Sequence, residues 1–138
     1  MKVRLRWVAL ETVLATHEQL IREHGGLRGI RDPGALESAL ARPKNVLGYR
    51  RMDLFSVAAS YIEGIVRNHP FVDGNKRTGF IVGYIFLRDN GYRLKVEETS
   101  AVCFMVGLAD RSISIARFEQ WLRKSCTRER HGRRPSSE

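Results

Sequence analysis

The chain has 138 residues, 43% hydrophobic and 28% charged, which suits a single globular domain with a core of its own. No run approaches the roughly 18 consecutive apolar residues of a membrane span, and the basic start lacks a signal peptide's apolar stretch, so we expect a cytoplasmic protein without membrane contact. The formal net charge is +9, and two cysteines, Cys103 and Cys126, are too few for a disulfide framework and lack metal-site spacing.

Two helices are predicted near the start of the chain. Apolar residues recur with helical spacing over residues 9–24, and Gly25-Gly26 ends this first helix. A second, short helix opens at Asp32-Pro33, where an N-cap residue precedes a proline in the first turn. Pro43 is expected to follow the end of this helix, and residues 44–51 are then predicted to form a loop.

A third helix is predicted over residues 54–68, because apolar residues form a stripe along one of its faces. A fourth begins near Asn75 or Lys76, is apolar on all sides over residues 80–87, and stops at Asn90-Gly91, so it is expected to be the buried central helix.

After an extended connector at residues 92–96, a fifth helix is expected, capped by Thr99 or Ser100. The residues predicted to face inward on it are Val102, Met105, Val106 and Leu108. A sixth helix is predicted over residues 115–124. These signals predict an all-α fold, a compact bundle of about six helices.

The bundle is expected to occupy residues 1–124, with a basic, flexible tail at residues 125–138. Residues 124–138 hold five basic and two acidic side chains and few apolar ones. Such a tail indicates either affinity for nucleic acid or an acidic partner, or a solvated segment. We favour the solvated segment, because runs of charge usually face solvent.

The segment HPFVDGNKRTG at residues 69–79 lies between the third and fourth helices. A loop that leads into a helix N-terminus can bind an anion, since the first backbone N–H groups have no partner within the helix. Lys76 and Arg77 make a polyphosphate the expected anion, and His69 lies upstream, where a general base would act. Asp73 is expected to be either a ligand for a hard cation such as Mg²⁺ or the N-cap of the fourth helix.

This segment resembles the signature of the Fic/Doc fold family, HPFx[D/E]GNGRxxR, and more narrowly that of its Doc ("death on curing") branch. It matches from His69 through Asn75 and again at Arg77. Lys76 and Phe80 stand where the wider pattern has glycine and arginine, and both departures are typical of the Doc branch. Residues 25–40 and 87–92 also resemble Doc proteins. The resemblance implies a helical Fic/Doc fold with its active loop between the third and fourth helices.

The resemblance also implies a role for each residue of the motif. His69 would take the proton of a protein hydroxyl, and Asp73 would bind the Mg²⁺ that accompanies the nucleotide. Nucleotide phosphates would be bound by Gly74, Asn75, Lys76 and Arg77. Pro70 and Phe71 are expected to be structural, as a stiff turn and an apolar anchor.

Lys76 bears on which group of the nucleotide is transferred. In the Doc branch this lysine goes with transfer of the γ-phosphate of ATP to a protein hydroxyl, so the resemblance implies a protein kinase. The implied target is a threonine of elongation factor Tu, whose modification arrests translation. One alternative is a Fic-type transferase of AMP. Another is a non-catalytic module that binds nucleic acid or protein, for which the +9 charge is the support. Direct nucleic-acid binding is not our expectation.

Regulation is expected to come from a second protein. Many Fic proteins carry an inhibitory helix of pattern [S/T]xxxE[G/N], which this chain lacks; the segment around Glu63 is one residue short of it. The resemblance therefore implies a toxin paired with a cognate antitoxin, whose disordered segment folds on it. By the same resemblance, residues 44–52 are either an edge that holds the target's backbone as an added strand or an ordinary connecting loop.

Overall fold

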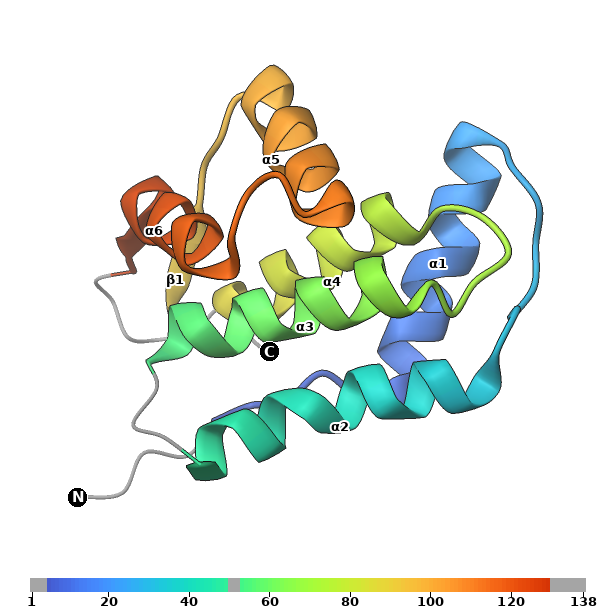
Figure 1. The fold of residues 1–138 in the computed structure, drawn as a ribbon, viewed down its shortest axis with the longest axis horizontal. Coiled ribbons are helices and arrows are strands. Elements are labelled where there is room, and N and C mark those ends of the chain that lie inside the picture. The colour runs from blue at the N-terminus through green and yellow to red at the C-terminus, as the bar shows by residue number, and fades with distance from the viewer. Residues whose placement is uncertain (1–4, 50–52, 130–138) are drawn as a thin grey trace.

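Six helices and a two-stranded sheet make up residues 5–49 and 53–129, the part of the chain that the computed structural model describes (Figure 1). The elements are α1 (Leu10–His24), α2 (Pro33–Tyr49), α3 (Leu54–Asn68), α4 (Asn75–Asp89), β1 (Tyr92–Leu94), α5 (Glu98–Asp110), α6 (Ile115–Ser125) and β2 (Cys126–Arg128). The predicted all-α class is confirmed. None of the described helices is long and apolar enough to cross a membrane.

Helix α3 lies at the centre of the molecule, with α2 along one side and α4 along another (Figure 1). Its predicted apolar stripe is buried, as at Val57, Ile62 and Ile65. Close approach of α4 depends on Gly83, because a Cβ there would collide with the Ile62 side chain. This contact sets the spacing between α3 and α4, and the motif lies between the end of α3 and the start of α4.

The end of α2 differs from the prediction. Asp32 caps the helix as expected, its carboxylate accepting from the backbone N–H of Ala35 at 3.0 Å, but Pro43 lies inside the helix, which continues to Tyr49. Proline costs a helical hydrogen bond, yet α2 packs against α3, and tertiary packing outweighs local propensity. The predicted loop at residues 44–51 is therefore wrong for 44–49, and so is the edge for an added strand there. Residues 50–52 lie outside the described part.

Helix α5 also departs from expectation at its start and on its outer face. It begins at Glu98 with Glu97 as N-cap, so Thr99 and Ser100 lie within its first turn. The inward-facing residues Met105 and Leu108 are buried, as expected. The prediction for two valines was wrong, because Val102 is 55% exposed and Val106 is 44% exposed. Those two stand four residues apart and share the outer face of the helix.

The segment predicted as a flexible tail from residue 125 begins with ordered structure. Strand β2 pairs antiparallel with β1, the expected extended connector, with Arg93 opposite Thr127. The pairing satisfies backbone groups that an isolated strand would leave open. Residues 130–138 lie outside the described part.

Candidate active site

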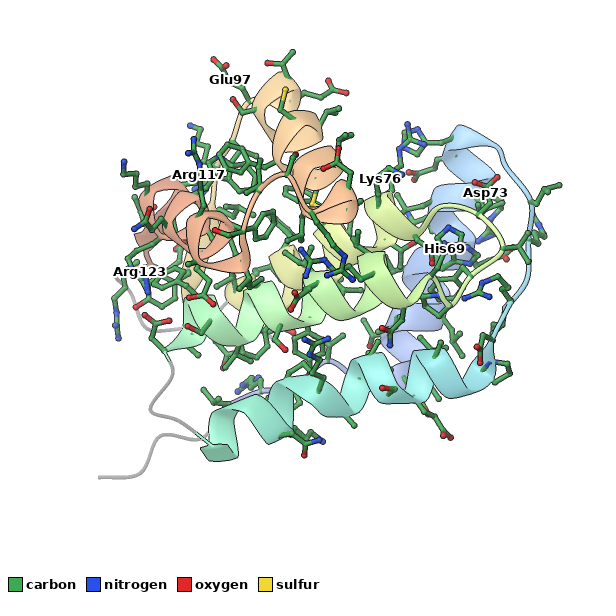
Figure 2. All side chains as sticks on the ribbon, viewed as in Figure 1. His69, Asp73, Lys76, Glu97, Arg117 and Arg123 are labelled. Atoms are coloured by element: carbon green, nitrogen blue, oxygen red, sulfur yellow. The ribbon has the colours of Figure 1, made fainter. Side chains whose placement is uncertain are left out.

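The motif loop, residues 69–74, connects the C-terminus of α3 to the N-terminus of α4. His69 is the C-cap of α3 and has left-handed backbone angles, φ 53° and ψ 54°. Gly74 is the N-cap of α4 and is left-handed as well, with φ 78°. Figure 2 shows His69, Asp73 and Lys76 at the end of the molecule away from Arg117 and Arg123. The His69 side chain is exposed, so a hydroxyl from another protein can reach it.

Arg31 fixes the backbone on which His69 stands. Its Nε donates to the carbonyl oxygen of His69 at 2.7 Å, and its Nη2 donates to that of Asn68 at 2.9 Å. Its backbone N–H donates to the carbonyl oxygen of Pro70 at 2.7 Å. A guanidinium at the C-terminus of α3 donates to carbonyl groups that have no partner within the helix. Its positive charge also interacts favourably with the helix dipole. These bonds oppose the strain of a left-handed histidine.

Phe71 anchors the loop in the core. Its side chain is fully buried and stacks on His17 of α1, with ring centroids 3.9 Å apart and an interplanar angle of 8°. Asn75 bonds the backbone of Phe71 on both sides: Oδ1 accepts from its N–H at 3.0 Å, and Nδ2 donates to its carbonyl at 2.9 Å. The buried Asn75 amide therefore closes the loop. For a phosphate it has its backbone N–H and its second Nδ2 hydrogen to offer.

Asp73 is held by backbone donors on both carboxylate oxygens. Oδ2 accepts from the N–H of Leu27 at 3.0 Å, and Oδ1 accepts from that of Gly74 at 2.9 Å. The bond from Leu27, followed by that from Gly74, lowers the pKa of Asp73, and the charges of His17 and His69 contribute in the same direction. The N-cap of α4 is Gly74, so Asp73 is not the cap that was one of its two expected roles.

An exposed, ionised carboxylate suits a Mg²⁺ ion that is shared with a nucleotide. Asp73 still has free lone pairs, because each oxygen accepts a single described hydrogen bond. No group of three metal-ligating side chains occurs among the described residues. Mg²⁺ does not need one, since it commonly takes one or two carboxylates, with water and phosphate oxygens completing its shell. The residues present therefore fit such an ion.

The start of α4 presents the donors for an anion. The first helical N–H with a partner in this turn is that of Thr78, which donates to Gly74 at 3.0 Å. The N–H groups of residues 75–77 precede it, where a helix offers no acceptors. Lys76 and Arg77 are exposed and make no ion pair with a described residue. At Gly74 a Cβ would lie 3.3 Å from Ile21, so glycine here serves both the positive φ and the contact with α1.

Comparison with known proteins decides the family. A model of the Fic/DOC family matches residues 7–87. The chain is 34% identical over 121 residues to "Protein kinase doc" of Escherichia phage P1, a match that covers 87% of this chain and 95% of that protein. The chain belongs to the Fic/Doc family. It is also 40% identical over 77 residues to "Toxin Doc" of Mycolicibacterium smegmatis, covering 53% of this chain and 58% of that one. These relatives assign it to the Doc branch.

Glu63 of this Fic/Doc chain lies in a network of ion pairs that links helices. It is buried and forms ion pairs with Arg42 of α2, at 3.2 Å, and with Arg67 one turn along α3. Arg67 also donates from Nε to the carbonyl of Leu108 at 3.1 Å. The carboxylate thus joins three helices through two arginines.

Three residues that hold the Fic/Doc motif in place were not expected from the sequence to do so. His17 is the first of them, and its Nε2 lies 2.9 Å from the backbone oxygen of Asp73. Its spacing with Val13 and Ile21, four residues to each side, marks it as part of the buried face of α1. Arg31 and the backbone of Leu27 carried no such signal, because their role depends on the loop folding back beside residues 69–73.

Proposed function

We propose that this Doc-branch protein transfers the γ-phosphate of ATP to a serine or threonine hydroxyl of another protein. The observation that carries the proposal is the pair of cations Lys76 and Arg77 on the first turn of α4, which make no ion pair with a described residue and lie one short loop away from the exposed His69. The relative named a protein kinase supports the same reaction class.

His69 acts as the general base in this proposal. A serine or threonine hydroxyl is a weak nucleophile until a base accepts its proton, and the imidazole of a histidine is a side chain that can accept it. As the hydroxyl oxygen bonds to the γ-phosphorus, the bond from that phosphorus to the bridging oxygen breaks and ADP leaves. The proton remains on the His69 ring. Arg31 keeps the ring in place by holding the histidine's backbone.

The start of α4 binds the phosphates. The backbone N–H groups of residues 75–77, the Lys76 ammonium and the Arg77 guanidinium all donate to oxygens that gain charge during transfer. Asp73 would hold Mg²⁺, which would neutralise phosphate charge when bound. Because positioning dominates phosphoryl transfer, the location of one cation decides which phosphorus meets the hydroxyl. Lys76 is the cation to which we assign that choice.

We further propose elongation factor Tu as the target and arrest of translation as the result, which makes the chain a toxin. The relative named "Toxin Doc" supports the toxin; the target rests on the resemblance of the motif. A cognate antitoxin would restrain it by folding a disordered segment on its surface. Expression of the wild-type chain alone should then stop growth, whereas co-expression with the neighbouring antitoxin or the His69→Ala change should restore it. Harmless expression of a folded wild-type chain would contradict the toxin proposal.

The direct test is an intact mass measurement of elongation factor Tu after incubation with the chain, ATP and Mg²⁺. A gain of one phosphoryl group is expected, and it should be absent with His69→Ala and present with His24→Ala, a matched change at an exposed histidine of α1. A gain of one adenylyl group would instead identify an AMP transferase. No change in mass, together with salt-sensitive nucleic-acid binding that survives His69→Ala, would favour a binding module.

A further inference from the structure

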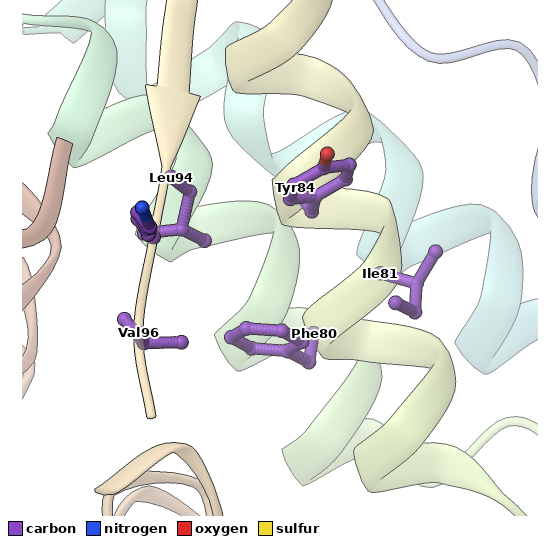
Figure 3. A pocket seen from close by; sticks show the side chains of 6 residues that line it. Phe80, Ile81, Tyr84, Leu94 and Val96 are labelled. Carbon is purple, nitrogen blue, oxygen red and sulfur yellow. The ribbon is translucent and has the colours of Figure 1, made fainter. Parts of the chain in front are cut away.

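A hollow beside α4 is lined by residues that lie outside the motif loop. It has a volume of about 290 Å³ and lies between α4 and the chain that follows β1 (Figure 3). Its lining residues are Phe80, Ile81, Tyr84, Leu94, Lys95 and Val96. We call it the α4 hollow. Figure 3 shows the Phe80 ring on α4 reaching toward Val96 on the opposite wall. Its size is close to the lower end of the range for small-molecule sites.

The α4 hollow continues the row of side chains that begins with the phosphate-binding cations. Phe80 stands four residues after Lys76, and Ile81 stands four after Arg77, so each pair shares one side of the helix. The opposite side is buried against the core, as at Val82 and Phe86. With a rise of about 1.5 Å per residue, Phe80 lies about 6 Å and Tyr84 about 12 Å along the axis from Lys76.

We propose that the α4 hollow binds the base of the nucleoside triphosphate whose phosphates lie at the start of α4. This inference rests on the proposed function. The ribose and base of a nucleotide extend over a length comparable to that from Lys76 to Tyr84, so one molecule spans both places. The ligand class is an aromatic base attached to a polyanion.

The chemistry of the lining favours a nucleobase. Phe80 and Tyr84 offer aromatic surface on which any base can stack. Of the six lining residues only Lys95 is charged, and it is exposed at the rim, where it can meet a base edge or its π-face. An apolar side chain from a protein partner would use the walls but gain nothing from the cations at residues 76 and 77. The base of a nucleotide uses both.

The test compares ATP with inorganic tripolyphosphate, which has the phosphates and no base. Calorimetric titrations with Mg²⁺ would use the wild type, Val96→Trp, which fills the hollow, and Tyr84→Leu, which removes an aromatic wall. Val102→Trp is the matched control, since it adds the same ring at an exposed site on α5. We expect the wild type to bind ATP roughly tenfold tighter than tripolyphosphate, the gain of about one stacked base. Both hollow variants should lose that preference and keep their affinity for tripolyphosphate.

Other outcomes overturn the inference in distinguishable ways. Equal affinity of the wild type for the two ligands, or an ATP preference that survives in both hollow variants, would remove the base from the α4 hollow and leave the phosphate site intact. An equal loss in Val102→Trp would show that the effect is not local and would also reject the hollow. Binding of neither ligand by the folded wild type, checked by circular dichroism, would overturn the proposed function together with this inference.

Discussion

His17 of α1 and Asp73 of the motif loop are joined by a hydrogen bond, although 56 residues separate them in sequence. The Nε2 atom of the imidazole lies 2.9 Å from the backbone oxygen of Asp73. Since a carbonyl oxygen only accepts, Nε2 carries the hydrogen. The same ring stacks on Phe71, so one buried side chain of α1 fixes both the anchor of the loop and the residue assigned to the metal.

Replacing His17 with phenylalanine should separate these two contacts, because stacking on Phe71 is retained and the bond to Asp73 is lost. We expect the free energy of unfolding to fall by about 1 kcal/mol, because the backbone carbonyl of Asp73 loses its hydrogen-bond donor. Phosphoryl transfer should fall by about tenfold to a hundredfold, as the loop loses its position. Steady-state kinetics and chemical denaturation measure the two effects. His24→Phe, at an exposed histidine of the same helix, is the control, and an equal loss there would contradict the positioning role.

Arg31→Met should impair transfer without emptying the nucleotide site, because Arg31 holds the backbone of His69 and touches none of the residues assigned to phosphate. We expect kcat to fall about tenfold with little change in the KM for ATP. The free energy of unfolding should drop by about 1 kcal/mol through loss of the exposed bonds to the end of α3. Added guanidinium at low concentration should restore part of kcat.

The control for Arg31 is Arg28→Met, since Arg28 lies on the same loop and pairs with Glu18 on the surface, at 3.0 Å. If Arg28→Met lowered kcat as much as Arg31→Met did, the effect would belong to the loop's charge and not to the bond with His69.

Lys76→Gly should weaken γ-phosphoryl transfer and expose AMP transfer. Removal of one donor from a charge-stabilising site costs about a hundredfold in rate. Glycine also costs a helix about 1 kcal/mol, so Lys76→Ala serves as the comparison that removes the charge alone. The measurement is the intact mass of the modified target with each variant. Unchanged kinetics in both would take Lys76 out of the mechanism.

Glu63→Gln should reduce stability and should not increase activity. Its carboxylate is buried between Arg42 and Arg67, and weakening this network leaves the half-buried Arg67 poorly paired, at a cost of about 2 kcal/mol. Thermal unfolding and transfer rates would be compared with Glu37→Gln, at an exposed glutamate of α2. A rise in activity with unchanged stability would identify Glu63 as an inhibitory glutamate after all.

Acid should loosen the motif loop through Asp73. The N–H groups of Leu27 and Gly74 lower the pKa of this carboxyl in the folded chain below its ordinary value of 3.8. A group with a depressed folded pKa contributes stability above its unfolded pKa, and that stability is lost as the pH falls through the folded pKa. The free energy of unfolding should therefore decline below pH 3.8, and the decline should be smaller in Asp73→Asn.

The pH experiment compares the curves of unfolding free energy against pH for the wild type and Asp73→Asn, because other carboxylates also titrate in this range. Asp89→Asn also removes one carboxylate of α4, one that pairs with Arg88, but leaves the loop alone, so it is the control for the loss of a carboxylate elsewhere. Identical acid dependence in the wild type and Asp73→Asn would show that the bonds to Asp73 contribute nothing to loop stability.

The sequence alone determined the features that depend on near neighbours. The apolar stripe of α3, the Asp32 cap of α2 and the ends of α1 and α4 were all predicted, because helical period and capping are set by residues within a turn or two. The grouping of the motif residues likewise follows from the sequence. His69 to Arg77 are close in space because they are close in sequence.

Only the tertiary structure decided the contacts between segments that are distant in sequence. Packing along α3 carries α2 through Pro43, and β2 joins the sheet because β1 offers it an edge. The bonds that shape the motif loop come from His17, Leu27 and Arg31, and the buried Asn75 amide closes the loop on the backbone of Phe71. Such contacts exist only once helices have packed, since burial and hydrogen bonding between remote residues leave no periodic signal in a sequence.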